Sequence, residues 1–447
     1  MPPHTESIRT QLARGPIQAR QLIEKIGLSQ PTISRAIAAL GVDVVRIGSG
    51  PSIQYTLRDT GRGINEVPVY RVSAEGTIRQ LGTLIPVRPE GFVMMQSDGK
   101  TLYSASLPWW LYDMRPQGYL GRALAANHAK LLGLPSQLTD WNDTHALRAL
   151  LAHGHDAIGN LLLGEAARDT FLSTTNLIPV TSQQKAERYI RFAEESTRGE
   201  SPGSSAGGEQ PKFLAYVETA AGPRHIIVKF TVAEDNPVTE RWRDLLLAEH
   251  LALNTLNNAQ ISAVQTSVVD FGNQRFLEIE RFDRVGEFGR RGLFSMAALD
   301  AEFVGAGNGW ATIAQALAKE KYIEPSAADA VARLQAIGVL IGNTDMHTGN
   351  LSFVSEHGRP YQLAPAYDML PMAFAPKTGG TIPSTLPDAT IHANISPNMW
   401  RNAEIVARVY LTSLRRETGF SHSFNSCIDA LENHIESAAR KIARLTN

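Results

Sequence analysis

The segment IGNTDMHTGNLSF, residues 341–353, concentrates polar side chains directly after an apolar run. It contains Asp345, His347 and Asn350, and a second carboxylate, Asp368, follows in APAYDMLP. Carboxylate and amide oxygens are suitable ligands for Mg²⁺, and a carboxylate can also accept the proton of an attacking hydroxyl. These residue types therefore indicate phosphoryl transfer, in which Mg²⁺ bridges the phosphates of a nucleotide while a base orients the attacking group.

The spacing within this set has two interpretations. Asp345 and Asn350 follow the D-x-x-x-x-N spacing of a protein-kinase catalytic loop, and Asp368 lies where a kinase places its metal-binding Asp. In the structural alternative, Asn343 and Asp345 only cap helix termini, and Asn350 lies in a turn. The choice depends on whether the other parts of a kinase occur in the chain.

Three further parts occur in the expected order. An ATP-dependent kinase needs a glycine-containing loop over the phosphates, a lysine on a strand and a glutamate on a helix. The sequence offers SSAGGEQPK at residues 204–212, then Lys229 in HIIVKF, then Glu249 in LLAEHLAL. Singly, they could be a plain linker, a solvated edge-strand lysine and a surface charge. Together, with EIERFDR as the segment that joins two lobes, they favour a kinase.

Four motifs together resemble one family. SAGGEQPK, IERFDR, GNTDMHTGNLSF and AYDMLP look like the HipA family of bacterial serine/threonine kinases, the toxin halves of type II toxin–antitoxin modules. The resemblance runs from about Val67 to the C-terminus, and it is greatest with the subgroup in which a helix-turn-helix precedes the kinase-like chain. It implies ATP and Mg²⁺ as cofactors, with Asp345 as the catalytic base and Asn350 and Asp368 as the Mg²⁺ ligands.

The resemblance also implies the remaining contacts with the nucleotide. Lys229 would be the ATP lysine, and His347 would be a residue near the phosphates; both are placed in the catalytic set. Further contacts are expected from the phosphate loop, the lobe-joining segment and the catalytic loop: Ser205, Gly207, Gly208, Gln210, Lys212, Glu280, Phe282 and Asn350. Ser205 would also be the regulatory phosphosite, whose autophosphorylation ejects the loop and silences the kinase. Ser204 is the alternative in the neighbouring register, and in the structural alternative both serines only keep a linker soluble.

Partners follow from the same resemblance. It implies a protein substrate, such as an aminoacyl-tRNA synthetase or another translation factor. An antitoxin is a candidate partner, but whether a separate one exists is left open, because typical family kinases borrow DNA binding from the antitoxin and this chain has an N-terminal domain for that purpose. The chain departs from the common kinase pattern because Met369 and Leu370, rather than Phe-Gly, follow the metal-binding Asp. This departure fits the family but removes the usual basis for predicting an activation-loop switch.

The first 62 residues have a different character from the rest. They carry eight Lys+Arg against four Asp+Glu, a net charge of +4, so the remainder carries -5 to give the total of -1. Three short helical patterns and a hairpin around GSGPS predict a winged helix-turn-helix that binds duplex DNA. The residues expected at the DNA are Ser29, Gln30, Thr32, Ser34, Arg35 and Arg46. The alternative is a small helical domain that binds protein.

The complete chain is expected to have an α+β fold. After the winged helix-turn-helix of residues 1–62, we expect an accessory subdomain over 66–180, with strands near its start and helix over 143–169. A kinase-like small lobe should follow over 181–284, and a mainly helical lobe with the catalytic and metal residues over 285–447. Trp109 and Trp110 are interpreted as packing residues.

The composition of the chain excludes several classes of protein and several kinds of site. The chain has 447 residues, 43% hydrophobic and 19% charged, which excludes the basic excess of a dedicated nucleic-acid coat protein. Cys427 is the single cysteine, so an internal disulfide and a Cys-rich zinc site are excluded. No signal sequence or membrane-spanning run occurs, and a cytoplasmic location without a membrane partner is expected.

Two rival functions remain at this point. One is a DNA-binding transcriptional regulator whose kinase-like region only senses a nucleotide. The other is a metal-dependent phosphoesterase or nuclease that uses Asp345, His347 and Asp368 as ligands. The second rival leaves Lys229 and the glycine-containing loop without a role.

Overall fold

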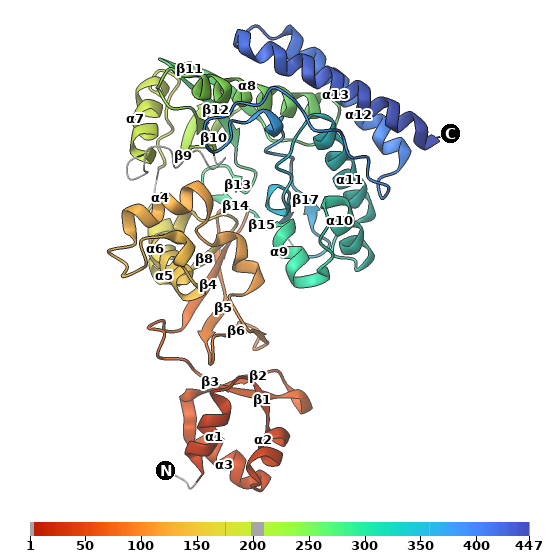
Figure 1. Cartoon of the computed structure of the whole chain (residues 1–447). Coiled ribbons are helices and arrows are strands. Elements are labelled where there is room, and N and C mark those ends of the chain that lie inside the picture. Colours follow the sequence, from red (N-terminus) through yellow and green to blue (C-terminus); the bar gives the residue numbers. More distant parts are fainter. Residues whose placement is uncertain (1–3, 175, 198–209, 357, 447) are drawn as a thin grey trace. The chain divides into compact units, whose positions relative to one another are not determined.

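The computed structural model describes residues 4–174, 176–197, 210–356 and 358–446 (Figure 1). The chain divides into two units. The first comprises the residues up to 116 together with 129–175, and the second comprises 117–128 together with the residues from 176 onward. Among the described residues, no helix combines the length and hydropathy needed to cross a membrane.

The first unit begins with three short helices and a small sheet. The helices are α1 (Thr5–Leu12), α2 (Ala19–Ile26) and α3 (Gln30–Leu40), and the sheet has the order β1 (Ile17–Gln18), β3 (Gln54–Leu57), β2 (Val44–Ile47). Gly27 ends α2 with a φ of 72°, a conformation that suits glycine. Pro31 lies in the first turn of α3, where the missing N–H costs little. The three predicted helices and the hairpin are therefore all present.

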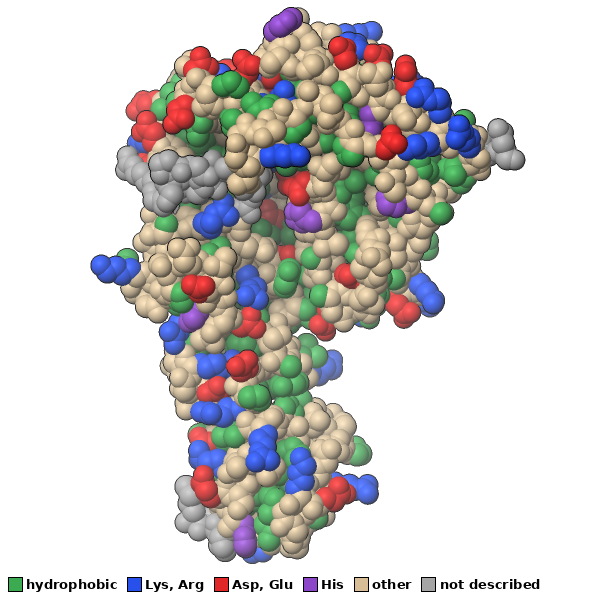
Figure 2. Space-filling model, viewed as in Figure 1, with side chains coloured by type: hydrophobic (Ala, Val, Ile, Leu, Met, Phe, Trp, Pro, Cys, Tyr) green, Lys and Arg blue, Asp and Glu red, His purple; other side chains and the backbone are tan. Residues whose placement is uncertain are grey.

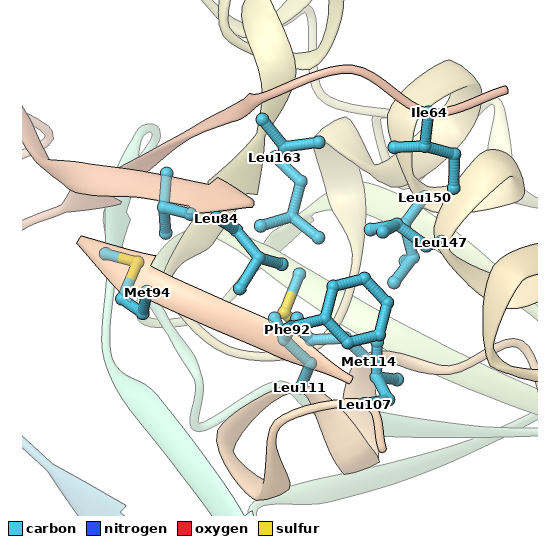
Figure 3. Close-up of a cluster of buried hydrophobic side chains, with 12 residues drawn as sticks. Ile64, Leu84, Phe92, Met94, Leu107, Leu111, Met114, Leu147, Leu150 and Leu163 are labelled. Carbon is cyan, nitrogen blue, oxygen red and sulfur yellow. The ribbon is translucent and has the colours of Figure 1, made fainter. Parts of the chain in front are cut away.

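A five-stranded antiparallel sheet follows in the same unit. Its order is β7 (Thr101–Ser104), β6 (Phe92–Gln96), β5 (Ile78–Pro86), β4 (Val67–Val72), β8 (Leu161–Leu163). Helices α5 (Asp143–His153) and α6 (Gly164–Ser173) lie on either side of β8 in the sequence, and α5 contributes Leu147 and Leu150 to the core in Figure 3. The predicted continuous helix over 143–169 is therefore wrong at its centre, because Leu161–Leu163 pair with β4 instead.

Strand β2 and the five-stranded sheet region share a hydrophobic cluster. Val45 and Ile47 of β2 pack with Ile85, Val87 and Val93 of the larger sheet. Main-chain hydrogen bonds also join the two parts, from Arg88 N to Leu57 O (2.8 Å) and from Asp59 N to Pro86 O (3.0 Å). The hairpin of the first 62 residues is thus held against the sheet that follows it.

The second unit contains a four-stranded antiparallel sheet with the order β11 (Thr266–Phe271), β12 (Gln274–Glu280), β10 (Gly222–Phe230), β9 (Lys212–Thr219). Helices α4 (Gly118–His128) and α7 (Lys185–Thr197) are linked where Tyr119 donates to the carbonyl of Ser196 (3.0 Å). One side of the sheet forms an aromatic core that includes Tyr189, Phe213, Phe230 and Phe276. The long helix α8 (Pro237–Asn258) contacts β11 and β12.

The rest of the second unit is mainly helical. A three-stranded sheet, in the order β15 (Gly292–Ser295), β16 (Ser352–Ser355), β17 (Gln362–Leu363), lies among the helices, and a hairpin of β13 (Arg284–Val285) and β14 (Gly289–Arg290) precedes it. The helices are α9 (Met296–Leu299), α10 (Trp310–Lys319), α11 (Pro325–Leu340), α12 (Pro397–Arg416) and α13 (Asn425–Ala443). α11 and α12 pack together, and Cys427 is buried in α13. The mixed helix and sheet composition agrees with the predicted α+β class.

Candidate active site

Lys229 lies near the end of β10, on the side of the strand opposite the aromatic core. Val228 and Phe230, its neighbours in the strand, are buried members of that core. Because side chains alternate along a strand, Lys229 points to the other face. There its Nζ lies 2.7 and 2.8 Å from the two carboxylate oxygens of Glu249, on α8. The predicted lysine and glutamate therefore meet as a buried ion pair.

The same ammonium group also contacts Asp368, which lies 139 residues further along the chain. Lys229 is 8% exposed, Glu249 is completely buried, and the side chain of Asp368 is 28% exposed. The ammonium group of Lys229 therefore contacts one fully buried carboxylate and one partly exposed carboxylate. This contact joins the strand lysine to the predicted metal ligand.

Burial and charge act against each other in this triad. Burial would lower the pKa of Lys229, but Asp368 and Glu249 raise it above its ordinary value. Burial raises the pKa of Glu249, although Lys229 offsets part of the effect. Burial would likewise raise the pKa of Asp368, but Lys229 and Lys212 together lower it. Lys229 is thus an ammonium and Asp368 a carboxylate at neutral pH, as binding of phosphate and of a cation requires.

Asp368 has an unusual backbone conformation, with a φ of 52°. Asp and Asn adopt this left-handed region more readily than other non-glycine residues do. The main chain of Asp368 is held by Asn343, whose Nδ2 donates to the Asp368 carbonyl (3.1 Å). The preceding residue, Tyr367, lies on the ring of Phe282 at 5.7 Å and donates from its hydroxyl to the carbonyl of Gly349 (2.9 Å).

Asn343 also holds the catalytic loop. α11 ends at Leu340, and Gly342, with a φ of 75°, turns the chain out of the helix. The side-chain oxygen of Asn343 accepts from the main-chain N–H of Asp345 (3.0 Å), so one buried amide fixes both predicted catalytic carboxylates. From the sequence, Asn343 was predicted only as a residue that could cap a helix terminus, in the structural alternative. Its position two residues before Asp345 was the signal that could have placed it in the site.

Asp345, His347 and Asn350 follow on this loop. The Asp345 side chain is exposed and has no hydrogen bond or ion pair within the described part of the chain. Asn350 donates from Nδ2 to the Asp345 carbonyl (2.8 Å), and this orientation leaves its side-chain oxygen for another ligand. His347 accepts from the Gly349 N–H through Nδ1 (3.0 Å), and its carbonyl accepts from Trp310 Nε1 (3.0 Å).

Only some of the other residues predicted to contact the nucleotide lie close to Lys229 or Asp368. Lys212 is paired with Lys229 across β9 and β10, and Gln210 donates to the Phe230 carbonyl (2.5 Å), so both lie beside the lysine strand. Glu280, at the end of β12, pairs with Arg224 at 3.1 Å, whereas Phe282 is next to Tyr367. Ser205, Gly207 and Gly208 lie outside the described residues.

The site is suited to Mg²⁺ and a nucleotide. Asn350 and Asp368 offer an amide oxygen and a carboxylate, the hard oxygen ligands that Mg²⁺ prefers, and a Mg²⁺ ion of this kind takes its other ligands from phosphates and water. Lys229 offers the cation for phosphate oxygens. Throughout the described ranges, no three His, Cys, Asp or Glu side chains form a group that could hold a metal ion. This geometry gives no support to Asp345, His347 and Asp368 as a three-ligand hydrolase centre.

Replacing Lys229 with Met is expected to destabilise the protein by about 3 kcal/mol or more, because the buried Glu249 carboxylate would lose its cation. Urea denaturation of the full chain, followed by circular dichroism, measures the change. The double variant Lys229→Met/Glu249→Leu is the matched control, since it removes both charges, and should recover much of the stability. Equal stability of the wild type and the single variant would contradict the buried ion pair.

The predicted DNA-contacting residues lie on the surface of the first unit. Ser29, Gln30, Ser34 and Arg35 are exposed at the start and along one side of α3, and Thr32 is half-buried. Arg46 is exposed on β2 between the buried Val45 and Ile47. Figure 2 shows basic side chains on the surface of this region.

Comparisons with known proteins agree with the resemblance. Residues 64–172 match the middle domain of YjjJ-like toxins, and residues 204–441 match the HipA-like C-terminal domain. Over 436 residues, the chain is 33% identical to toxin YjjJ of Escherichia coli strain K12, covering 97% of this chain and 98% of the relative.

Solved structures support the fold. HipA of Shewanella oneidensis MR-1, in a complex with HipB and operator DNA, matches with a TM-score of 0.59 at 17% identity, covering 85% of this chain and 99% of that chain. The proinflammatory kinase CtkA of Helicobacter pylori matches over 54% of this chain and 91% of its own, at 13% identity and a TM-score of 0.38, which is too low to support a conclusion. The HipA-like fold is therefore shared at low sequence identity.

Proposed function

Because the chain belongs to the HipA-like toxin family, in its YjjJ-like branch, we propose that it is an ATP- and Mg²⁺-dependent kinase of protein Ser/Thr hydroxyls. The observation that carries this proposal is the contact of Lys229 with both Glu249 and Asp368, tied by Asn343 to the loop of Asp345. Phosphoryl transfer by a kinase uses this combination of lysine, helical glutamate, metal-binding aspartate and catalytic loop.

In the proposed reaction, Asp345 accepts the proton of the substrate hydroxyl as the hydroxyl oxygen forms a bond to the γ-phosphorus of ATP. The bond from the γ-phosphorus to the β,γ-bridging oxygen breaks, and ADP leaves. Lys229 exchanges its contact with Asp368 for contacts with phosphate oxygens. Glu249 keeps the ammonium group of Lys229 in position. Asn350 and Asp368 would hold Mg²⁺, which neutralises the charge that develops on the phosphates. His347, Gln210 and Lys212 would line the phosphate side of the site, and Glu280 and Phe282 the lobe-joining side.

The deciding experiment is incubation of the purified chain with labelled ATP and Mg²⁺, followed by mapping of phosphorylated residues by mass spectrometry. Phosphate on Ser or Thr residues is expected, and Ser205 is the first position to inspect. A phosphate at Ser205 would add about 1.5 to 2 negative charges beside the nucleotide phosphates, which disfavours a closed phosphate loop and makes Ser205 an off-switch. ATP hydrolysis without transfer to any protein would overturn the kinase proposal.

The N-terminal region is proposed to be a winged helix-turn-helix that binds duplex DNA. Four of its eight cations are exposed and take part in no ion pair among the residues that the structure describes: Arg14, Lys25, Arg35 and Arg46. The four others pair with acidic groups, such as Arg9 with Asp43 at 2.5 Å. Operator DNA and an antitoxin are partners of the Shewanella HipA complex, and we propose both kinds of partner for this chain.

DNA binding should weaken steeply with salt, because cations that contact phosphates release counterions. The variant Arg35→Ala/Arg46→Ala should bind DNA less tightly. The plot of log association constant against log salt concentration should become shallower by about 2. Fluorescence anisotropy with duplex DNA at several salt concentrations measures both quantities. Arg191→Ala, which removes an exposed cation paired with Glu195 on α7, is the control.

Point variants are preferable to deletion of the first 62 residues. Deletion would remove Val45 and Ile47 and uncover their partners Ile85, Val87 and Val93 in the larger sheet. Wild-type affinity and an unchanged salt slope in the double variant would show that these cations do not contact DNA.

A further inference from the structure

Tyr367 connects the two parts of the chain that carry the proposed Mg²⁺ ligands, Asn350 and Asp368. It directly precedes Asp368, and its hydroxyl donates to the main-chain carbonyl of Gly349 (2.9 Å). This carbonyl and the nitrogen of Asn350 belong to one planar peptide group, so a bond that holds the carbonyl also holds the start of Asn350. One side chain therefore links the main chain beside each ligand.

The Tyr367 side chain is held at its hydroxyl and at its ring. The Ser352 hydroxyl oxygen lies 2.7 Å from the Tyr367 hydroxyl oxygen. A tyrosine hydroxyl has one hydrogen, which Tyr367 donates to Gly349, so Ser352 is the donor in this second bond. Ser352 is buried on β16, and the Tyr367 ring stacks on the ring of Phe282 at an angle of 29°. The hydroxyl therefore has a fixed position from which to hold the Gly349 carbonyl.

The other contacts fix the separation of the two ligands less directly. The Asn343 amide joins the main chain of Asp368 to that of Asp345, and Asn350 is linked to Asp345 only through its own side chain. A cavity of about 10 Å³ borders both Asn350 and Tyr367, which is room for one water at most. Packing between these two residues is thus incomplete, and the hydrogen bond from Tyr367 is the direct link.

We propose that Tyr367 is a positioning residue, whose hydroxyl sets the separation of Asn350 and Asp368 for Mg²⁺. The proposal rests on the kinase function proposed above and identifies how that kinase holds its metal ligands. Mg²⁺ demands a nearly regular octahedron of oxygen atoms, so ligands on two separate segments bind it well only when their separation is fixed. The Tyr367 hydroxyl is not itself a ligand in this proposal, because Gly349 and Ser352 already engage it.

The test replaces Tyr367 with Phe in the full chain, which removes the hydroxyl and keeps the ring that stacks on Phe282. Isothermal titration calorimetry gives the dissociation constant of ATP in EDTA and in excess Mg²⁺, and the ratio of the two constants measures the strengthening due to the metal. This ratio should fall about two- to tenfold in the variant, the range that one hydrogen bond contributes. The constant in EDTA should equal that of the wild type, because Lys229 and Lys212 are unchanged.

Tyr410→Phe is the matched control. The Tyr410 hydroxyl also donates to a main-chain carbonyl of the second unit, that of Ala248 on α8 (3.1 Å), so the same chemical group is removed from a bond that does not adjoin a proposed metal ligand. This variant should keep the wild-type ratio. The Mg²⁺ concentration that gives half-maximal phosphoryl transfer should likewise rise for Tyr367→Phe and stay unchanged for Tyr410→Phe.

The outcomes separate this proposal from the kinase function. Equal ratios in the wild type and Tyr367→Phe, or an equal loss of ATP affinity with and without Mg²⁺, would overturn the positioning role and leave the kinase function intact. Both constants belong to the folded protein, so a lower melting temperature of the variant does not change the ratio. A wild type that binds ATP equally with and without Mg²⁺, and transfers phosphate to no protein, would overturn the kinase proposal and the positioning role together.

Discussion

Replacing Asp345 with Asn is expected to lower the rate of phosphoryl transfer by about 10²- to 10⁴-fold, the range that a positioned general base contributes. The Asp345 side chain takes part in no hydrogen bond or ion pair within the described residues, so its replacement should disturb little of the fold. The loop itself is held through main-chain groups, by Asn343 at 3.0 Å and Asn350 at 2.8 Å. ATP should therefore still bind.

Single-turnover transfer from labelled ATP and equilibrium binding of ATP measure the two quantities for this variant. Asp329→Asn, which alters an exposed carboxylate on α11, is the matched control and should behave as the wild type does. Intact DNA binding by the Asp345 variant, together with lost transfer, would favour an enzyme over a regulator that only senses the nucleotide. Transfer at the wild-type rate would remove Asp345 from the proposed mechanism.

Replacing Asp368 with Asn is expected to abolish the Mg²⁺ dependence of ATP binding and to lower transfer by about 10³-fold, as loss of charge stabilisation at the phosphates implies. Asn is the suitable replacement because it tolerates the φ of 52°, whereas Ala would add backbone strain. Lys229 would still be paired with Glu249 at 2.7 Å, so the fold should survive. This variant should therefore lose ATP affinity that the Asp345 variant keeps.

Titrations of ATP in the presence and absence of Mg²⁺ distinguish the proposed role of Asp368 from that of Asp345. In the wild type, Mg²⁺ should strengthen ATP binding, and in the Asp368 variant it should have little effect. Lys229→Met provides the contrast, since that change should lower stability, whereas Asp368→Asn should not. Unchanged Mg²⁺ dependence in the Asp368 variant would assign the metal to other groups.

Several structural features could be predicted because their causes are local. The pattern of apolar residues predicted the helices of the first 62 residues, since periodicity acts within a few residues. Gly27 at the end of α2 and Pro31 in the first turn of α3 agree with it. The strand of Lys229 and the helix of Glu249 were predicted for the same reason. Strand β8 was missed because three leucines are too few to show a period, and their pairing with β4 depends on a partner about 90 residues earlier.

The sequence by itself determined which chemical groups the protein has and in what order. The spacing of Asp345, Asn350 and Asp368 and the order of Lys229 and Glu249 indicated a kinase, and the motifs around them indicated the family to which the chain belongs. These inferences depend only on residue type and separation.

Only the tertiary structure decided which of these groups meet. The contact of Lys229 with Asp368 spans 139 residues, and Asn343 binds main-chain groups of two loops that no local pattern relates. Packing brings such groups together through the sum of many weak contacts across the fold, and no short stretch of sequence contains that information.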